Sequence, residues 1–144
     1  MKKNNLITVG WREWIALPEL GISRIKAKID TGARSSALHA FHVDTFEEHG
    51  QSKVRFALHP RQYSTKKATH CLADLVDIRW VSDSGGHREK RCVIKTLVLL
   101  GDISYKVEIT LASRDDMRFR MLLGRTALSK RFLVDASASY LLGK

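Results

Sequence analysis

The residues best suited to chemistry lie in the segment 27–35, where a strand-like pattern ends in Asp30-Thr31-Gly32. A carboxylate at the end of a core strand has its position fixed by the sheet, and a following glycine lets other backbone approach closely. A side chain held in this way can transfer protons to and from a bound reactant. The same three residues also fit an ordinary surface turn, so the functional interpretation depends on the elements around them.

Two segments are expected to support this acidic loop. Residues 24–29 alternate charged and apolar side chains at a period of two, which predicts a strand with one buried face that leads into Asp30. The apolar run 119–123 predicts another strand, which ends at Gly124 and passes directly into a short helix over 125–131.

A long hairpin is the clearest of the other predicted elements. The extended runs 71–82 and 89–100 flank Gly85 and Gly86, which can adopt the positive φ angles that tight hairpin turns require. Further extended patterns cover residues 6–9, 11–17, 37–46, 53–58, 103–111, 132–134 and 140–142.

These patterns bound the fold class. The chain has 144 residues, which fits a single domain over 1–144. Strand patterns dominate, so we expect a mainly β protein, a closed or partly closed barrel with one short helix near the C-terminus.

The order of these parts resembles the retropepsin-like aspartic proteases. Those proteins combine a buried strand into Asp-Thr-Gly-Ala, a glycine-tipped flap hairpin, an apolar strand into Gly-Arg, a short helix and a C-terminal strand. The sequence is also similar to a bacterial family labelled ATP-dependent zinc protease, whose members resemble single-domain retropepsins; the similar stretches are 9–14, 28–34, 83–88 and 117–125. The resemblance covers nearly the whole chain and implies an acid-protease fold, a closed β-barrel, with aspartic-type peptidase activity.

The resemblance also implies roles for individual loop residues. Asp30 is expected to be the catalytic carboxylate, Thr31 to reach the backbone of a partner subunit, and Gly32 to permit that close approach. Ala33 is expected to line the floor beside the substrate. The flap tip, which would close over an extended peptide, is expected at Ser84, Gly85 and Gly86.

The support behind the loop departs from the family pattern at one position. Leu123 and Gly124 are expected to pack behind the catalytic loop. In viral relatives the residue four after the catalytic aspartate is acidic and pairs with the arginine that follows the second glycine. Here that residue is Arg34, so we expect Arg125 to find another acid or to remain solvated, and Arg34 to be able to face substrate.

Aspartic protease chemistry requires two carboxylates in one site. Two such groups cannot both ionise at close range, so they share a proton; the ionised one activates a water and the protonated one polarises the scissile carbonyl. The sequence has a single Asp-Thr-Gly. We therefore expect a two-fold homodimer in which each subunit supplies Asp30.

The charge of the chain points to an acidic partner. Lys and Arg exceed Asp and Glu by 25 to 15, a net charge of +10, and several cations lie on or near the predicted flap. The family is associated with ATP-grasp glutamate ligases, which implies a functional link to such a ligase and glutamate-rich peptides or protein tails as substrates. The alternatives are a non-catalytic basic β-barrel that binds nucleic acid, and a pseudo-protease that binds acidic peptides without cleaving them.

Metal, nucleotide and membrane functions find little support. The sequence has no HExxH motif for zinc and no GxxxxGK[ST] loop for triphosphate, so we expect no cofactor. A metal site formed by His39, His42, His70 and Cys71 stays open as the less favoured alternative. Two cysteines, no signal peptide and no membrane-length apolar run predict a soluble, cytoplasmic protein.

Overall fold

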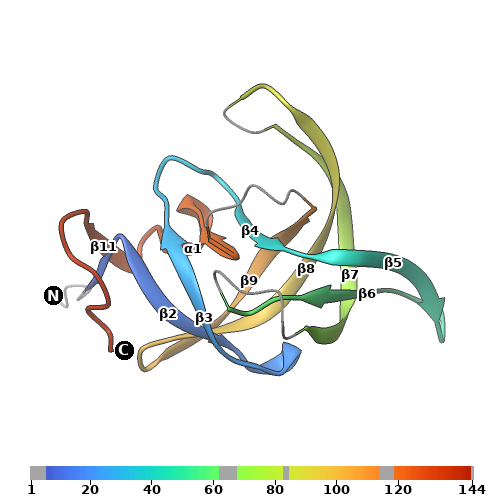
Figure 1. Ribbon diagram of the computed structural model, residues 1–144, viewed down its shortest axis with the longest axis horizontal. Coiled ribbons are helices and arrows are strands. Elements are labelled where there is room, and N and C mark those ends of the chain that lie inside the picture. The colour runs from blue at the N-terminus through green and yellow to red at the C-terminus, as the bar shows by residue number, and fades with distance from the viewer. Residues whose placement is uncertain (1–5, 62–67, 83–84, 114–118, 144) are drawn as a thin grey trace, which may run out of the picture.

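The computed structural model describes residues 6–61, 68–82, 85–113 and 119–143. In these residues it is mainly β with one short α-helix, which confirms the predicted fold class at that level (Figure 1). A two-stranded parallel sheet pairs β1 (Ile7–Gly10) with β11 (Phe132–Asp135).

The second sheet has nine strands in the order β2-β3-β10-β4-β9-β8-β7-β6-β5. One further pairing, Ala16 with Leu99, links β2 to β8 and connects the first six strands into a ring. The strand bounds are β2 (Arg12–Leu17), β3 (Ile22–Ile29), β4 (Ser36–His39), β5 (Phe41–Glu48), β6 (Gln51–Leu58), β7 (Thr69–Ser82), β8 (Arg88–Leu100), β9 (Ile103–Ala112) and β10 (Met121–Leu123). The two helical elements are the 3-10 turn η1 (Pro18–Leu20) and α1 (Arg125–Leu128).

The short strand β10 brings the two loops of the candidate site together. It runs parallel to β3, with Leu123 opposite Ile29, and antiparallel to β4, with Met121 opposite Leu38. All four of these residues are buried in the apolar core. Because β3 and β10 end side by side, Asp30 and Gly124 emerge at the same place.

Burial follows the predicted alternation in β3. Ile25, Ala27 and Ile29 are buried, whereas Arg24 and Lys28 on the opposite face are exposed. The core that these residues enter is a single cluster of apolar side chains drawn from most of the strands and from α1.

The prediction of one continuous strand over 37–46 is wrong. The structure divides it at Ala40 into β4, which pairs with β9 and β10, and β5, which pairs with β6. Ala40 donates its backbone N–H to Ala112 O at 2.9 Å, which ties this break to the end of β9. The division thus coincides with a change of neighbouring strands.

The hairpin of β7 and β8 curves away from the other strands (Figure 1). A bulge between Leu75 and Asp77 shifts the register of β7 there. Trp80 lies beyond this bulge and is 60% exposed.

The C-terminal segment 140–142 is a turn and not the predicted extended segment. The fully buried carboxylate of Glu13 on β2 holds this segment in place. Its Oε2 atom accepts N–H groups from Gly10 at 2.7 Å and Leu141 at 2.9 Å, and its Oε1 atom accepts the N–H of Leu142 at 3.2 Å. The carboxylate thus takes the place of a strand partner for the tail.

Replacing Glu13 by Ala is expected to lower the free energy of unfolding by about 3 kcal/mol, because three backbone donors lose their acceptor. Glu13→Gln should cost less, since the amide retains one acceptor oxygen. Urea titration of the two variants measures both values. Equal stability of Glu13→Ala and the wild type would contradict the assigned role of this carboxylate.

Candidate active site

Asp30 is fixed by its own loop and by the neighbouring strand. Its backbone N–H donates to Leu123 O at 2.9 Å, and its Oδ1 atom accepts the N–H of Gly32, also at 2.9 Å. The Oδ2 atom lies 4.0 Å from Lys28 Nζ, and the carboxylate side chain is 28% exposed. The group is therefore held in one orientation while part of it remains accessible to a reactant.

The segment 124–126 packs directly on the segment that follows Asp30. Arg125 N donates to Ala33 O at 2.7 Å, and the N and Oγ1 atoms of Thr126 each donate to Arg34 O at 3.1 Å. Gly124 N donates to the buried Ser36 Oγ at 3.1 Å. Four hydrogen bonds thus join the two loops.

A side chain at position 124 would not fit between these loops. A Cβ atom there would lie 2.5 Å from Ser35 O and 2.8 Å from Ala33 O, both of which are backbone atoms. The backbone of Gly124 is extended, with φ −95°, so glycine is required by the close approach and not by the conformation. The structure thus places Leu123 and Gly124 against the loop that carries Asp30.

The Arg125 guanidinium binds backbone carbonyl groups of the Asp30 loop. Its Nη1 atom donates to Thr31 O at 3.1 Å and to Gly32 O at 3.4 Å. Arg125 remains exposed, which agrees with the second of the two expected outcomes, and two loop carbonyls in addition accept its Nη1–H groups. Such a contact depends on loop shape, which is why the sequence pattern did not reveal it.

The flap residues are only partly described. Gly85 and Gly86 are exposed at the end of the β7–β8 hairpin, and Gly86 has φ 84°, which a side chain would disfavour. Ser84 lies outside the described residues.

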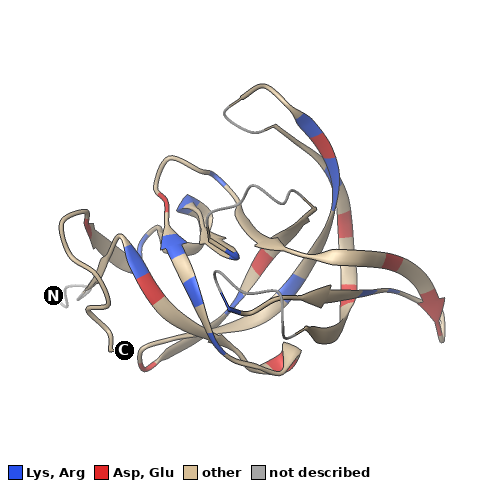
Figure 2. Cartoon of the chain, viewed as in Figure 1, with Lys and Arg blue, Asp and Glu red and all other residues tan. Residues whose placement is uncertain are grey.

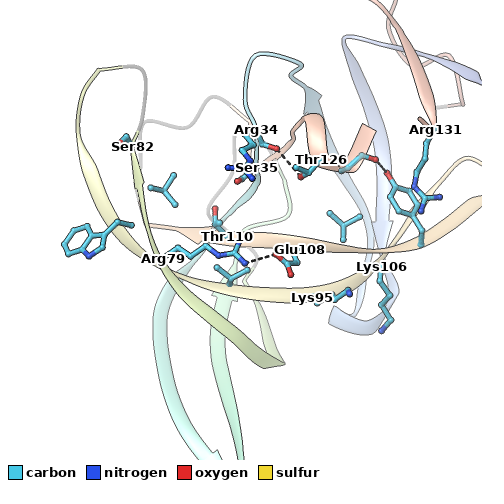
Figure 3. A pocket seen from close by; sticks show the side chains of 16 residues that line it. Arg34, Ser35, Arg79, Ser82, Lys95, Lys106, Glu108, Thr110, Thr126 and Arg131 are labelled. Atoms are coloured by element: carbon cyan, nitrogen blue, oxygen red, sulfur yellow. Dashed lines mark hydrogen bonds and ion pairs between the residues drawn. The ribbon is translucent and has the colours of Figure 1, made fainter. Parts of the chain in front are cut away.

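A cavity of about 690 Å³ separates the hairpin from the loop that follows Asp30 (Figure 3). Arg34 and Ser35 line it on the loop side, and residues 79–82 line it on the hairpin side. Asp30 itself is not among the lining residues. The cavity thus borders the Asp30 loop at Arg34 and not at Asp30 itself.

Cations predominate in this cavity. A single carboxylate, Glu108, is among the lining residues, and Arg79 pairs with it at 3.0 Å. The cationic lining residues are Arg34, Arg79, Lys95, Lys106 and Arg131. Sequence reasoning missed Arg79 and Lys106 because strand pairing between β7, β8 and β9 assembles the site.

Tyr105 connects the cavity to α1. Its hydroxyl donates to Ala127 O at 2.6 Å, and burial raises the pKa of this group to about 12, against the opposing effect of Arg131. The guanidinium of Arg131 lies 4.1 Å from the centre of the Tyr105 ring. Tyr105 therefore stays a neutral donor that fixes the wall of the cavity.

A second, open groove of about 660 Å³ lies beside the Asp30 loop. Its polar lining residues are Thr31, Arg34, Arg125, Thr126 and Ser129, and apolar side chains form the rest. Among the apolar residues Leu133 is 54% exposed. The apolar lining residues are Leu128, Phe132, Leu133, Val134 and Ala136.

A comparison with protein-family models shows the family of this chain. Residues 8–144 match the RimB-like family model, which is described as retropepsin-like aspartic endopeptidase RimB. The chain belongs to the RimB-like family. The description of this family names an aspartic endopeptidase, in place of the zinc protease label met at the sequence level.

Curated relatives of this RimB-like chain are longer proteins. The chain is 45% identical over 141 residues to a "probable alpha-L-glutamate ligase" of Shewanella pealeana, covering 98% of the chain and 31% of that protein. It is 39% identical over 136 residues to a protein of the same name from Desulfotalea psychrophila, covering 94% of the chain and 29% of that protein. The RimB-like chain thus spans about a third of the length of the relatives it matches.

A solved structure shares the fold of the RimB-like chain. The crystal structure of protein Lpg0085 of Legionella pneumophila, of unknown function, superposes with a TM-score of 0.80 at 24% identity. The match covers 96% of the RimB-like chain and 99% of the Legionella chain.

Other chemistries find no assembled site in the described part of this RimB-like chain. No group of three or more His, Cys, Asp and Glu residues there could hold a metal ion. Cys71 and Cys92 are free, and burial raises both thiol pKa values, that of Cys71 to about 11. Neither thiol is therefore activated as a nucleophile at neutral pH. No described helix is long and apolar enough to cross a membrane.

Proposed function

We propose that this RimB-like chain is an aspartic-type peptidase with the acid-protease barrel, active as a homodimer with one Asp30 from each subunit. The observation that carries the proposal is the Asp30 carboxylate, which is fixed by Gly32 N–H and partly exposed on a loop held between two core strands. This placement supports a role for Asp30 in proton transfer, with Thr31 and Gly32 forming the rest of the catalytic loop.

The reaction is hydrolysis of a peptide bond. One Asp30 is ionised and takes a proton from a water, whose oxygen attacks the carbonyl carbon. The partner subunit's Asp30 is protonated and donates to the carbonyl oxygen. The C–N bond then breaks, and the proton held by the first carboxyl group passes to the leaving amine. One hydroxyl of the tetrahedral gem-diol returns its proton to the partner subunit's Asp30 as the new carboxylic acid forms, which restores the starting protonation of the pair. Ala33 and Arg34, with the flap at Ser84, Gly85 and Gly86, are proposed to hold the peptide.

The open groove beside the Asp30 loop supports the dimer. It begins at Thr31 and Arg125 and continues over exposed apolar residues such as Leu133. A second copy covering this groove would bury these side chains and bring the two Asp30 loops together on the symmetry axis.

The substrate class that we propose is an acidic, glutamate-rich peptide or protein tail. The cavity next to the Asp30 loop has five cationic lining residues and one carboxylate. The curated relatives are named as alpha-L-glutamate ligases, which is consistent with a product rich in glutamate as the substrate of this chain and with a functional link to such a ligase. We place the reaction in the cytoplasm, where thiols such as the free Cys71 and Cys92 stay reduced.

A paired substrate assay tests the proposal. The protein is incubated with a glutamate-rich peptide and with a glutamine-rich peptide of equal length, and the products are identified by mass spectrometry. We expect cleavage of the acidic peptide, unaffected by a metal chelator. Binding of the acidic peptide without cleavage would favour the pseudo-protease, and tight, salt-dependent binding of RNA would favour the non-catalytic nucleic-acid barrel.

Charge removal in the cavity tests the substrate class separately. The double variant Arg34→Gln, Lys95→Gln should raise KM for the acidic peptide about tenfold, because each cation supplies a modest attraction to substrate carboxylates. Initial rates over a range of peptide concentrations give this value, and Lys90→Gln is a single-charge control outside the cavity lining. An unchanged KM in the double variant would contradict an acidic substrate in this cavity.

A further inference from the structure

A second basic surface lies along β3, outside both cavities. Arg24, Lys26 and Lys28 share its outer face, and Arg12 on β2 stands opposite Lys28 in the strand register. We call these four residues the β3 strip. Figure 2 shows the repeated basic positions along β3, which lead up to the acidic residue at its end.

Aromatic rings hold the cations of the β3 strip in place. The Arg24 guanidinium lies 3.8 Å from the centre of the Trp14 ring, and Lys26 Nζ lies 5.2 Å from the same centre. Tyr140 stacks on Trp14 with ring centres 5.8 Å apart and an interplanar angle of 18°, and Arg12 lies 5.0 Å from the Tyr140 ring. Cation–π contacts of this kind limit the freedom of long basic side chains and arrange them in advance of binding.

The chain fixes Tyr140 at a cost in backbone conformation. Its φ is 55°, an unusual value for a bulky residue. The Tyr140 N–H donates to Arg12 O at 3.0 Å, and the next two N–H groups donate to the buried Glu13 carboxylate. Strained positions persist where the surroundings over-determine them, and they often occur at functional sites.

The charges of the β3 strip lack local compensation. Within the described ranges, no carboxylate lies in ion-pair distance of Arg12, Arg24 or Lys26, and the acid near Lys28 is Asp30, with Nζ and Oδ2 4.0 Å apart. Elsewhere on the sheet, comparable cations are paired, as in Lys53 with Asp74 at 2.6 Å. The strip is therefore a continuous positive surface that ends at the candidate catalytic carboxylate.

We propose that the β3 strip binds the acidic stretch of the substrate that extends beyond the cleaved bond. Alternate side chains of an extended peptide repeat every ~6.7 Å, as do alternate residues of a strand, so successive glutamates can meet successive cations. From Arg24 to Asp30 the strip covers ~20 Å, the length of about six extended residues. This assignment rests on the proposed function, because it takes the acidic substrate from there.

The aromatic rings favour a carboxylate polymer over nucleic acid as the occupant. Single-stranded nucleic acid binds where bases can stack on open rings. Here Trp14 and Tyr140 lie against each other and against cations, and Trp11 lies against Arg12 at 4.7 Å and Phe119 at 5.8 Å. The rings are therefore occupied by contacts with one another and with the cations. The charged groups are what remains available to bind a ligand.

The test measures binding in the Asp30→Asn background, so that it does not depend on catalysis. Fluorescence anisotropy compares labelled peptides of about four and about twelve glutamates, the shorter of which cannot span the β3 strip. Arg24→Gln with Lys26→Gln should weaken binding of the long peptide about tenfold and leave the short peptide unchanged. The matched control is Lys53→Gln with Arg55→Gln on β6, which has the same spacing and a cation 4.4 Å from the ring of Phe46.

Four outcomes overturn the β3 strip assignment. They are an unchanged affinity for the long peptide, an equal loss for both peptides, an equal loss in the β6 control, and tighter strip-dependent binding of an RNA oligonucleotide than of the long peptide. Circular dichroism of each variant excludes unfolding as the cause of a loss. A failure of the proposed function would appear elsewhere, as an absence of cleavage by the wild-type protein that still binds the long peptide through the strip.

Discussion

The Asp30→Asn variant is expected to lose peptide cleavage by about 10²–10⁴-fold while keeping its fold. Asparagine has nearly the same shape as aspartate, and its Oδ1 atom can still accept the Gly32 N–H that orients the group. What it cannot do is take a proton from water or share one with a second carboxyl group. Mass spectrometry of peptide products, with thermal melting as the control for folding, measures the two properties separately.

Mixing this variant with the wild-type protein tests the shared site more sharply. If each site needs two Asp30 carboxyl groups and subunits exchange at random, a mixed dimer is inactive. A ninefold excess of Asp30→Asn should then reduce the cleavage rate of a fixed amount of wild-type protein to about a tenth. Gln51→Ala, at an exposed position on β6, is the matched control. It retains Asp30, so a ninefold excess of it should raise the total cleavage rate about tenfold in place of reducing it.

Two results would contradict the dimeric mechanism. The first is a cleavage rate that stays constant as Asp30→Asn is added, which would mean that one carboxyl group per site is enough. The second is cleavage by Asp30→Asn alone at the wild-type rate, which would remove Asp30 from the chemistry. Native mass spectrometry of the same mixtures, with one of the two proteins isotopically labelled, confirms that exchange has taken place.

The local part of the candidate site could be predicted from the sequence. The period-two pattern before Asp30 and the apolar run before Gly124 each depend on neighbouring residues only, and both strands form where the pattern indicates. Strand β10 is shorter than the predicted run because Phe119 and Arg120 fall outside the ladder with β3 and β4.

The parts that could not be predicted arise from contacts between distant segments. Arg125 binds carbonyl groups of a loop more than 90 positions away, and such acceptors exist at every residue and leave no mark in the sequence. Tyr140 adopts φ 55° because Glu13, far away in the chain, captures the following N–H groups. The local pattern predicted an extended tail over 140–142, but the hydrogen bonds to the buried Glu13 carboxylate hold it as a turn.

The same reasoning explains the basic surfaces. Charge counts indicated an acidic partner but could not divide the cations between surfaces. The fold does so by strand register: Arg79 and Lys95 line a cavity, whereas Arg24 and Lys26 lie on the outer face of β3. Nine of the 25 basic residues thus lie on two surfaces that both border the Asp30 loop.

Gly124→Ala is expected to destabilise the protein by about 2–4 kcal/mol and to abolish cleavage. The new methyl carbon would lie 2.5 Å from Ser35 O and 2.8 Å from Ala33 O. Neither atom is the end of a flexible side chain, so the segment 124–126 must move away from the segment 33–36. That movement breaks hydrogen bonds that hold the loop after Asp30.

Gly50→Ala is the matched control for this substitution. Gly50 has φ +78°, and a methyl group added there would meet nothing within 4 Å, so alanine costs only the left-handed conformation, about 1–2 kcal/mol. Gly124 has φ −95°, which alanine adopts freely. If backbone conformation alone decided stability, Gly50→Ala would destabilise the protein more. If packing decides it, Gly124→Ala destabilises the protein more. Urea titration ranks the two, and a Gly124→Ala protein as stable as Gly50→Ala would show that the loops are not held together by this close approach.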